Sequence, residues 1–229
     1  MKSFPLDSLV TYKLPNPKIR LGRNGDGGYV ILDGFTYDFF IGCGIDKEIS
    51  FENDFCQKYN IPCVTFDGTV NGIPDTKENI RFVQKNISGT ESDTTTNLHD
   101  LIKDKENIFL KMDIEGGEYD WLPSLSEEQL NKFAQIVIEF HYPFTKEKTD
   151  CLEQLNKTHW LCHFHGNNCD TFFITNDVIV PRVFECTYIN KKFTKEPPPR
   201  NDTSFPTEVD RPNDSSRADI TLQGYPFSQ

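Results

Sequence analysis

The chain has 229 residues, which is enough for one α/β domain with a full core and short for two. Its formal net charge of −11, from 24 basic and 35 acidic residues, argues against a nucleic-acid partner, which would need a basic surface. The sequence has no apolar run near the roughly 20 residues of a membrane-spanning helix and no signal peptide at its start, so we expect a cytoplasmic protein without a membrane partner.

Apolar runs alternate with amphipathic stretches from about residue 37 onward. The pattern predicts these strands and helices, in chain order: strand 37–45, helix 47–59, strand 62–66, strand 80–87, helix 97–105, strand 108–114, helix 126–133, strand 135–141 and helix 146–157. Ser126 followed by Gln129 is typical of a helix N-cap. Strands that alternate with helices predict a mostly parallel sheet. Three more strands, at 159–165, 171–175 and 184–193, predict an antiparallel end to that sheet.

The composition changes at residue 196, where Pro197-Pro198-Pro199 and many Asp, Asn and Ser residues begin. We therefore expect a folded domain at 1–195 and a Pro-rich extended tail at 196–229. Phe205, Leu222 and Phe227 are among the apolar residues of the tail, so we expect it to dock in part. Within the domain, we expect residues 1–36 to form a segment that covers a cofactor and its substrate.

Glycines and an aspartate mark the first two strand ends, where ligands bind in doubly wound sheets. The first strand ends in Gly42-Cys43-Gly44, where backbone can approach a ligand closely. A dinucleotide fingerprint needs a third glycine, and that position holds Lys47, so the pattern favours S-adenosylmethionine over NAD. Asp67-Gly68 ends the second strand, where the carboxylate can accept hydrogen bonds from ribose hydroxyls. The same dipeptide would also form an ordinary turn.

Two further segments complete the expected cofactor site. Asn86 and Ile87, at the end of the third strand, are placed to meet the adenine ring by polar and apolar contact. Asp26 and Tyr29 belong to the sequence Asp26-Gly27-Gly28-Tyr29, which we expect to fold over the cofactor. A plain β-turn is the alternative for these glycines.

Polar side chains follow otherwise apolar strands in the middle of the chain. Asp113 ends the fourth strand, on the same face as Lys111 and Glu115, and would lie beside the transferring methyl. Glu139 and His141 share a face of the fifth strand, and His163 and His165 follow on the sixth. We expect these groups to meet at neighbouring strand ends, and we take His141, Asp113, Glu139 and His165 as the candidate catalytic residues.

Three kinds of chemistry fit these residues. A histidine with a pKa near neutrality can take the proton of an attacking hydroxyl. A hard divalent ion such as Mg²⁺ or Mn²⁺, held by Asp113 and Glu139 with or without His141, could instead bind a diol and acidify it. The residues leave these two routes open. A zinc site at Cys162, His163, His165 and Cys169 is a third interpretation, although the spacing fits no standard zinc finger.

The motifs together resemble the FkbM-type branch of class I S-adenosylmethionine-dependent methyltransferases. The resemblance rests on the segments Arg23–Val30, Phe40–Gly44, Phe66–Thr69, Lys111–Glu118 (KMDIEGGE, close to the family's KIDIEGAE) and Ile138–His141. It implies a Rossmann-like seven-stranded sheet with helices on both faces, and a cofactor bound by Gly42, Gly44, Asp67 and the loop after the third strand. Cys43 departs from the small or acidic residue of many methyltransferases.

The resemblance also implies O-methyl transfer, often to sugars, and members that modify glycans of large viruses and microbes look most similar. We therefore expect methylation of a sugar hydroxyl in a glycan or glycoside, such as that of a deoxyhexose. One alternative is methylation of another small molecule or of a protein side chain. Another is a non-catalytic binding module, and in either case the chain could be one domain of a larger glycan-building protein. A NAD oxidoreductase is disfavoured by Lys47.

Overall fold

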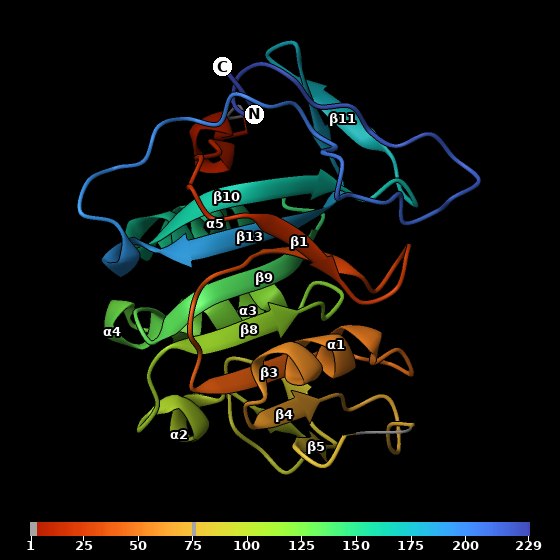
Figure 1. Cartoon of the computed structure of the whole chain (residues 1–229), viewed down its shortest axis with the longest axis vertical. Helices are drawn as coiled ribbons and strands as arrows, with labels where there is room; N and C mark the ends of the chain where they lie inside the picture. Colours follow the sequence, from red (N-terminus) through yellow and green to blue (C-terminus); the bar gives the residue numbers. More distant parts are fainter. Residues whose placement is uncertain (1–3, 75–76) are drawn as a thin grey trace.

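A seven-stranded sheet forms the centre of the protein, and the computed structural model describes residues 4–74 and 77–229. Figure 1 shows its strands stacked in the order β10-β13-β9-β8-β3-β4-β5. Their bounds are β3 (Phe39–Cys43), β4 (Cys63–Phe66), β5 (Ile80–Val83), β8 (Ile108–Met112), β9 (Phe133–His141), β10 (His159–Gly166) and β13 (Val183–Asn190). β13 runs antiparallel to both of its neighbours, and the other neighbouring pairs are parallel. The predicted seven-stranded, mostly parallel α/β sheet is confirmed.

Helices cover both faces of this sheet, as predicted, but unequally. The helices are α1 (Ser50–Tyr59), α2 (His99–Ile102), α3 (Glu118–Trp121), α4 (Glu127–Leu130) and α5 (Lys146–Thr158), with short 3-10 helices η1 (Leu6–Leu9), η2 (Leu122–Ser124) and η3 (Lys191–Phe193). Successive residues of a strand point to opposite faces. Ile41 of β3 accordingly joins the core cluster that contains side chains of α2 to α5, whereas Phe40 packs with Phe51 and Phe55 of α1.

The cap predicted for the helix at 126–133 is present, but this helix, α4, is shorter than predicted. The Ser126 hydroxyl accepts a hydrogen bond from the Gln129 backbone at 3.1 Å, and the Gln129 side chain accepts one from the Ser126 backbone at 2.8 Å. The helix ends at Leu130 because the long strand β9 already begins at Phe133.

An N-terminal hairpin, which the sequence pattern did not predict, lies beside α1 on the same face of the sheet (Figure 1). It consists of β1 (Lys18–Leu21) and β2 (Tyr29–Leu32), which pair antiparallel. The Thr187 hydroxyl of β13 donates to the Val30 carbonyl at 2.6 Å, and the Gln135 side chain of β9 pairs with both backbone polar groups of Leu32 at 2.8 and 3.0 Å. These bonds fix the hairpin on the sheet and place its connection, residues 22–28, at the carboxyl edge of the parallel strands.

Two predicted strands of the main sheet are wrong in part. The strand predicted at 80–87 ends at Val83, and Asn86–Ile87 forms a separate short strand, β6, that pairs with β7 (Thr95–Thr96). The segment 171–175 does not enter the main sheet but forms a hairpin of β11 (Phe172–Thr175) and β12 (Val178–Pro181). Phe172 and Ile174 of β11 are exposed, whereas Phe173 between them packs against the main core.

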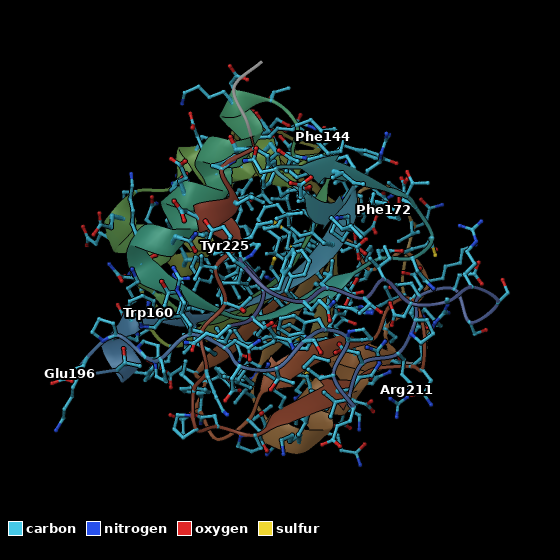
Figure 2. The ribbon with its side chains drawn as sticks, turned by 90° about the horizontal axis from the view of Figure 1, so that it is seen from above. Phe144, Trp160, Phe172, Glu196, Arg211 and Tyr225 are labelled. Atoms are coloured by element: carbon cyan, nitrogen blue, oxygen red, sulfur yellow. The ribbon has the colours of Figure 1, made fainter. Side chains whose placement is uncertain are left out.

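The tail crosses the molecule as an extended strip. Figure 2 shows it passing from Glu196 to Arg211 and returning to Tyr225. Phe205, Leu222 and Phe227 are buried in the main core, and the Phe205 and Leu222 backbones exchange two hydrogen bonds of 2.8 and 2.9 Å. The tail thus contributes side chains to the core of the domain.

Within residues 4–74 and 77–229, no helix is both long and apolar enough to span a membrane. All seven cysteines are free thiols, of which only Cys169 is exposed.

Candidate active site

A cavity of about 580 Å³ opens at the carboxyl edge of the parallel strands. Seven predicted cofactor residues line it: Asp26, Tyr29, Gly44, Asp67, Asn86, Ile87 and Asp113. The other lining residues are Arg23, Gly27, Ile45, Asp46, Glu48, Phe66, Thr69, Lys85, Lys111, Ile114 and Glu115. The loops after β3, β4, β5 and β8 therefore meet here with the connection of the N-terminal hairpin, which is where an α/β sheet binds its ligand.

Asp67 accepts hydrogen bonds from the loops that follow β3 and β4 and so fixes this part of the cavity wall. One carboxylate oxygen accepts hydrogen bonds from the backbone of Ile45 and Asp46 at 3.1 and 2.9 Å, and the other accepts from the backbone and hydroxyl of Thr69 at 2.7 and 2.6 Å. Burial raises the pKa of Asp67, but these donors outweigh burial and lower the pKa overall. The group is thus an anion that fixes the loop after β3 and still faces the cavity.

Gly44 allows two loops to touch behind the cavity. Its φ is +69°, and a Cβ at this position would lie 1.5 Å from the Asp113 carbonyl oxygen. The Lys111 ammonium also donates to the Gly44 carbonyl at 2.6 Å, so the loops after β3 and β8 are joined twice. No side chain other than hydrogen fits at this position without moving the Asp113 backbone.

Three predicted cofactor residues lie behind the wall rather than on it. Gly42 is in β3, where a Cβ would lie 3.0 Å from Glu52 of α1. The Cys43 side chain is buried in the core of the opposite face, and burial raises the pKa of its thiol. A Cβ on Gly68 would lie 2.5 Å from the Asn86 side chain. These residues bring neighbouring segments close together and do not line the cavity.

An acidic group surrounds His141 beside the cavity. The His141 ring nitrogens lie 3.4 Å from Glu118, 3.4 Å from Glu115, 3.6 Å from Glu139 and 3.8 Å from Asp113. Asp113 also accepts a hydrogen bond from the Tyr29 hydroxyl at 2.8 Å. Asp113 therefore belongs both to the cavity wall and to this acidic centre.

The geometry of the acidic centre suits a bound cation. One ligand atom from each of Asp113, Glu139 and His141 lies within 4.8 Å of the other two. One oxygen of Asp113 and one oxygen of Glu139 are buried without a hydrogen-bond partner among the described residues, and the His141 Nε2 atom lies 3.8 Å from Asp113 and 3.6 Å from Glu139. Buried polar atoms are rarely left unpaired, and two carboxylates with an imidazole can coordinate a divalent ion, so the residues fit such an ion or a polar substrate group.

The acidic surroundings also change the protonation of the centre. Burial, with the nearby Asp113 and Glu185 carboxylates, raises the pKa of Glu139 well above its ordinary value. Burial lowers the pKa of His141, but the carboxylates around it, Glu118 foremost, outweigh burial and raise that pKa overall. A proton or a bound cation is thus favoured at this point of the structure.

The structure separates the histidines of β10 from His141. β13 lies between β9 and β10, so the fifth and sixth predicted strands are not neighbours. His163 contacts Asp210 of the tail at 2.8 Å, and His165 lies between Glu185 of β13 at 3.4 Å and Asp219 of the tail at 3.1 Å. His165 is therefore not placed among the groups that line the cavity.

The zinc interpretation does not fit the structure. Cys162 is buried in a small separate cluster with Leu32 and Ile189, and Cys169 is exposed. Cys162, His163, His165 and Cys169 form no ligand group within residues 4–74 and 77–229, and the two histidines contact Asp210, Glu185 and Asp219 instead.

Several contributors to the centre had no assigned role at the sequence level. Glu118 is fully buried and accepts the His141 backbone N–H at 2.9 Å, and Asn167 donates to Glu139 at 3.0 Å. Glu185 is the cross-strand partner of Glu139. Glu118 lies within the KMDIEGGE motif, which could have identified it. Asn167 follows β10 and Glu185 lies in β13, and no local pattern indicates how these two strands pair.

Comparisons with known proteins identify the same region. A family model described as the methyltransferase FkbM domain matches residues 43–168, which is more than half of the chain. A solved structure named as a ribosomal RNA methyltransferase from Plasmodium falciparum matches with a TM-score of 0.40 and 10% identity, over 68% of this chain and 87% of that chain. Another, named as a riboflavin biosynthesis protein from Shewanella sp. PV-4, matches with a TM-score of 0.23 and 16% identity, over 68% of this chain and 75% of that chain.

Likenesses this weak carry no argument about function, and no curated protein matches the chain. The family model, by contrast, spans Gly44, Asp67, Asp113, Glu139 and His141, the residues that build the cavity and the acidic centre. The chain belongs to the FkbM methyltransferase family.

Proposed function

We propose that the protein transfers a methyl group from S-adenosylmethionine to a hydroxyl of a sugar. The observation that carries this proposal is the position of Asp113. Its side chain lines the cavity and also lies 3.8 Å from His141 of the acidic centre. A donor in the cavity and an acceptor at the centre would therefore meet at Asp113, which is the arrangement that transfer between two bound molecules requires.

The cavity supports an adenosyl donor. Its volume of about 580 Å³ falls within the usual range for small-molecule sites. The anionic Asp67 lines the cavity and could accept from a ribose hydroxyl in place of the Thr69 hydroxyl, and Asn86 and Ile87 offer a polar and an apolar contact to an adenine ring. When bound, S-adenosylmethionine supplies an electrophilic methyl on a positively charged sulfur, which suits a wall that contains Asp26, Asp46, Asp67, Asp113 and Glu115.

The acidic centre favours a neutral acceptor rich in hydroxyls. Carboxylates only accept hydrogen bonds when ionised, so Asp113 and Glu115 match hydroxyl donors, and Glu139 can either donate or accept according to whether it holds a proton. A phosphate or carboxylate acceptor would be repelled by the same groups. Sugars are the abundant class with this chemistry, and methylation of another small molecule or a protein side chain is the alternative that an acceptor panel would reveal.

His141 is the side chain placed to take the acceptor proton. Its backbone is held by Glu118, and the carboxylates around the ring stabilise the imidazolium that forms. Asn167 orients Glu139 through a 3.0 Å hydrogen bond, so that the second oxygen of Glu139 is left for an acceptor hydroxyl or a cation. If Mg²⁺ or Mn²⁺ binds Asp113, Glu139 and His141, the ion would acidify the acceptor and His141 would act as a ligand.

The first test is thermal. The melting temperature is measured with S-adenosylhomocysteine, with NAD and with neither, each with and without Mn²⁺. A ligand at about 100 times its dissociation constant stabilises the fold by roughly 2.7 kcal/mol, which a melting curve resolves. We expect a shift with S-adenosylhomocysteine and none with NAD. No shift with S-adenosylhomocysteine would overturn the proposed donor.

The second test separates the acidic centre from the cavity. Glu139→Gln and His141→Ala are expected to bind S-adenosylhomocysteine like the wild type but to lose methyl transfer to a panel of sugars. Glu128→Gln, a change at an exposed helix position, is the matched control. Direct Mn²⁺ titration of the wild type and Glu139→Gln then distinguishes the two routes, because only the ion route predicts binding that Glu139→Gln weakens. Turnover by both variants at the wild-type rate would show that the centre has another role.

A further inference from the structure

A segment of the tail contacts residues of the cavity wall and of the strands beside the acidic centre. This segment, residues 210–219, is called the strap. Its polar contacts to the domain are Asp210 to His163 at 2.8 Å, Asn213 to Glu185 at 2.9 Å and to Asp26 at 3.3 Å, Asp214 to Asn168 at 2.8 and 2.9 Å, Arg217 to the Cys169 carbonyl at 2.9 Å, and Asp219 to His165 at 3.1 Å. The family model ends at residue 168, so it includes none of the strap.

Asn213 is the strap residue that touches the cavity wall. Its amide nitrogen donates to Asp26, which lines the cavity on the hairpin connection, and to Glu185, which lies opposite Glu139 on the neighbouring strand. A single buried amide thereby links the loop over the cavity to the strand beside the acidic centre. An amide can donate to two carboxylates, whereas an ionised carboxylate at the same place would repel both.

The rest of the strap fixes the position of that amide. Asp214 and Asn168 exchange two hydrogen bonds, and Asn168 follows Asn167, whose side chain holds Glu139. On the other side, His165 lies between Glu185 and Asp219, which raises its pKa to about 10 against the effect of burial. A positively charged His165 therefore compensates the charge of Glu185, to which Asn213 donates.

We propose that Asn213 is a positioning residue of the methyl-transfer site, through which the strap holds the Asp26 loop over the bound donor. The expected effect on methyl transfer rests on the proposed function, whereas the expected effect on the position of residues 22–28 does not. Removing the amide donor frees Asp26 and leaves Glu185 without one partner. Residues 22–28 then lose their only side-chain hydrogen bond to the strap among the described residues and move away from the cavity.

The experiment compares Asn213→Asp and Asn213→Ala with Asn201→Ala in the full chain. Asn201 is also a buried tail asparagine, but its side chain donates only to the carbonyls of Thr203 and Phe227, far along the tail from the strap. Three readouts are taken: the melting temperature, amide hydrogen exchange of residues 22–28 without ligand, and the S-adenosylhomocysteine dissociation constant with kcat/KM.

We expect both Asn213 variants to speed hydrogen exchange at residues 22–28 and to weaken S-adenosylhomocysteine binding at least fivefold, whereas Asn201→Ala lowers the melting temperature without either change. The ratio of Asn213→Asp to wild-type kcat/KM should rise as the pH falls, because a protonated carboxyl regains one donor. Asn213→Ala cannot show that rise.

Three results would overturn the proposal. The first is hydrogen exchange at residues 22–28 that is the same in both Asn213 variants as in the wild type. The second is an effect of Asn201→Ala on exchange and on S-adenosylhomocysteine binding as large as that of the Asn213 variants. The third is a ratio of Asn213→Asp to wild-type kcat/KM that does not change with pH. If the wild type binds no S-adenosylhomocysteine, the proposed function fails, and the hydrogen-exchange comparison still decides whether the strap holds the loop.

Discussion

The contact between Gly44 and the Asp113 carbonyl joins the wall of the cavity to the acidic centre through backbone atoms. Because the two residues end adjacent parallel strands, any displacement of one loop moves the other. Side chains then add specificity: Asp67 orders the Gly44 side of this contact, and Tyr29 binds Asp113 on the other. The site is thus sensitive to single substitutions that add only a few atoms.

Gly44→Ala should abolish donor binding. The added Cβ would have to occupy the position of the Asp113 carbonyl, and a φ of +69° strains any residue with a Cβ. Gly72→Ala is the control, since a Cβ there meets no atom within 4 Å. Calorimetry with S-adenosylhomocysteine measures both. Equal binding by Gly44→Ala and Gly72→Ala would mean that the two loops can separate without loss.

Asp67→Ala should weaken S-adenosylhomocysteine binding by tenfold or more, which corresponds to about 1.4 kcal/mol. The change removes the acceptor for Ile45, Asp46 and Thr69 and the anion that faces the cavity. Asp67→Asn keeps the shape of the side chain but exchanges one acceptor oxygen for a donor, so we expect an intermediate loss of affinity. Calorimetric titration with S-adenosylhomocysteine measures both variants. An unaltered dissociation constant in Asp67→Ala would exclude Asp67 from the donor site.

Strand β9 connects most parts of the site. It carries Glu139 and His141 at its carboxyl end, and near its start the buried Gln135 binds the backbone of the N-terminal hairpin and the Tyr37 hydroxyl. The hairpin connection in turn supplies Asp26 to the cavity. One long strand therefore fixes both the acidic centre and the segment that brings Asp26 to the cavity.

Gln135→Leu should destabilise the fold by about 2 kcal/mol or more, since an unpaired buried polar group costs roughly 1–3 kcal/mol and the change leaves two backbone groups of Leu32 without partners. Gln57→Leu, at an exposed position of α1, should stay within about 0.5 kcal/mol of the wild type. Urea unfolding measures the difference, and an equally small effect of both changes would contradict the role given to Gln135.

The sequence predicted those parts of the fold that local patterns determine. The apolar runs of β3, β4, β8 and β9 and the glycines and aspartates at their ends led to the correct sheet and to most of the cavity wall. Long-range pairing was not predictable in the same way. The insertion of β13 between β9 and β10 removed His165 from the expected cluster. The docking of the hairpin β1–β2 and the Asn213–Asp26 contact depend on residues more than a hundred positions apart, such as Leu32 with Gln135.

Buried charge links the tail to the stability of the entire fold. His165 is protonated between Glu185 and Asp219, and its pKa is raised from 6.5 to about 10 on folding. The folded state therefore holds the proton more tightly than the unfolded state, and the stabilisation is complete below pH 6.5 and lost as the pH rises to about 10.

His165→Gln should flatten this dependence. We expect the melting temperature of the wild type to fall more steeply than that of His165→Gln between pH 7 and pH 10, and the two curves to converge at the alkaline end. Melting curves at constant ionic strength measure the slopes. Parallel curves would show that His165 is not charged in the folded protein.

The place of β13 in the sheet also has a consequence for biosynthesis. β9 and β10 are separated by a strand that the ribosome makes after both of them, so each presents an unpaired edge while the chain is still growing. Domains fold as their segments emerge, and open edges of this kind invite aggregation. A nascent chain from which Val183–Asn190 has not yet emerged is therefore expected to depend on a chaperone more than one in which β13 is free to pair with β9 and β10.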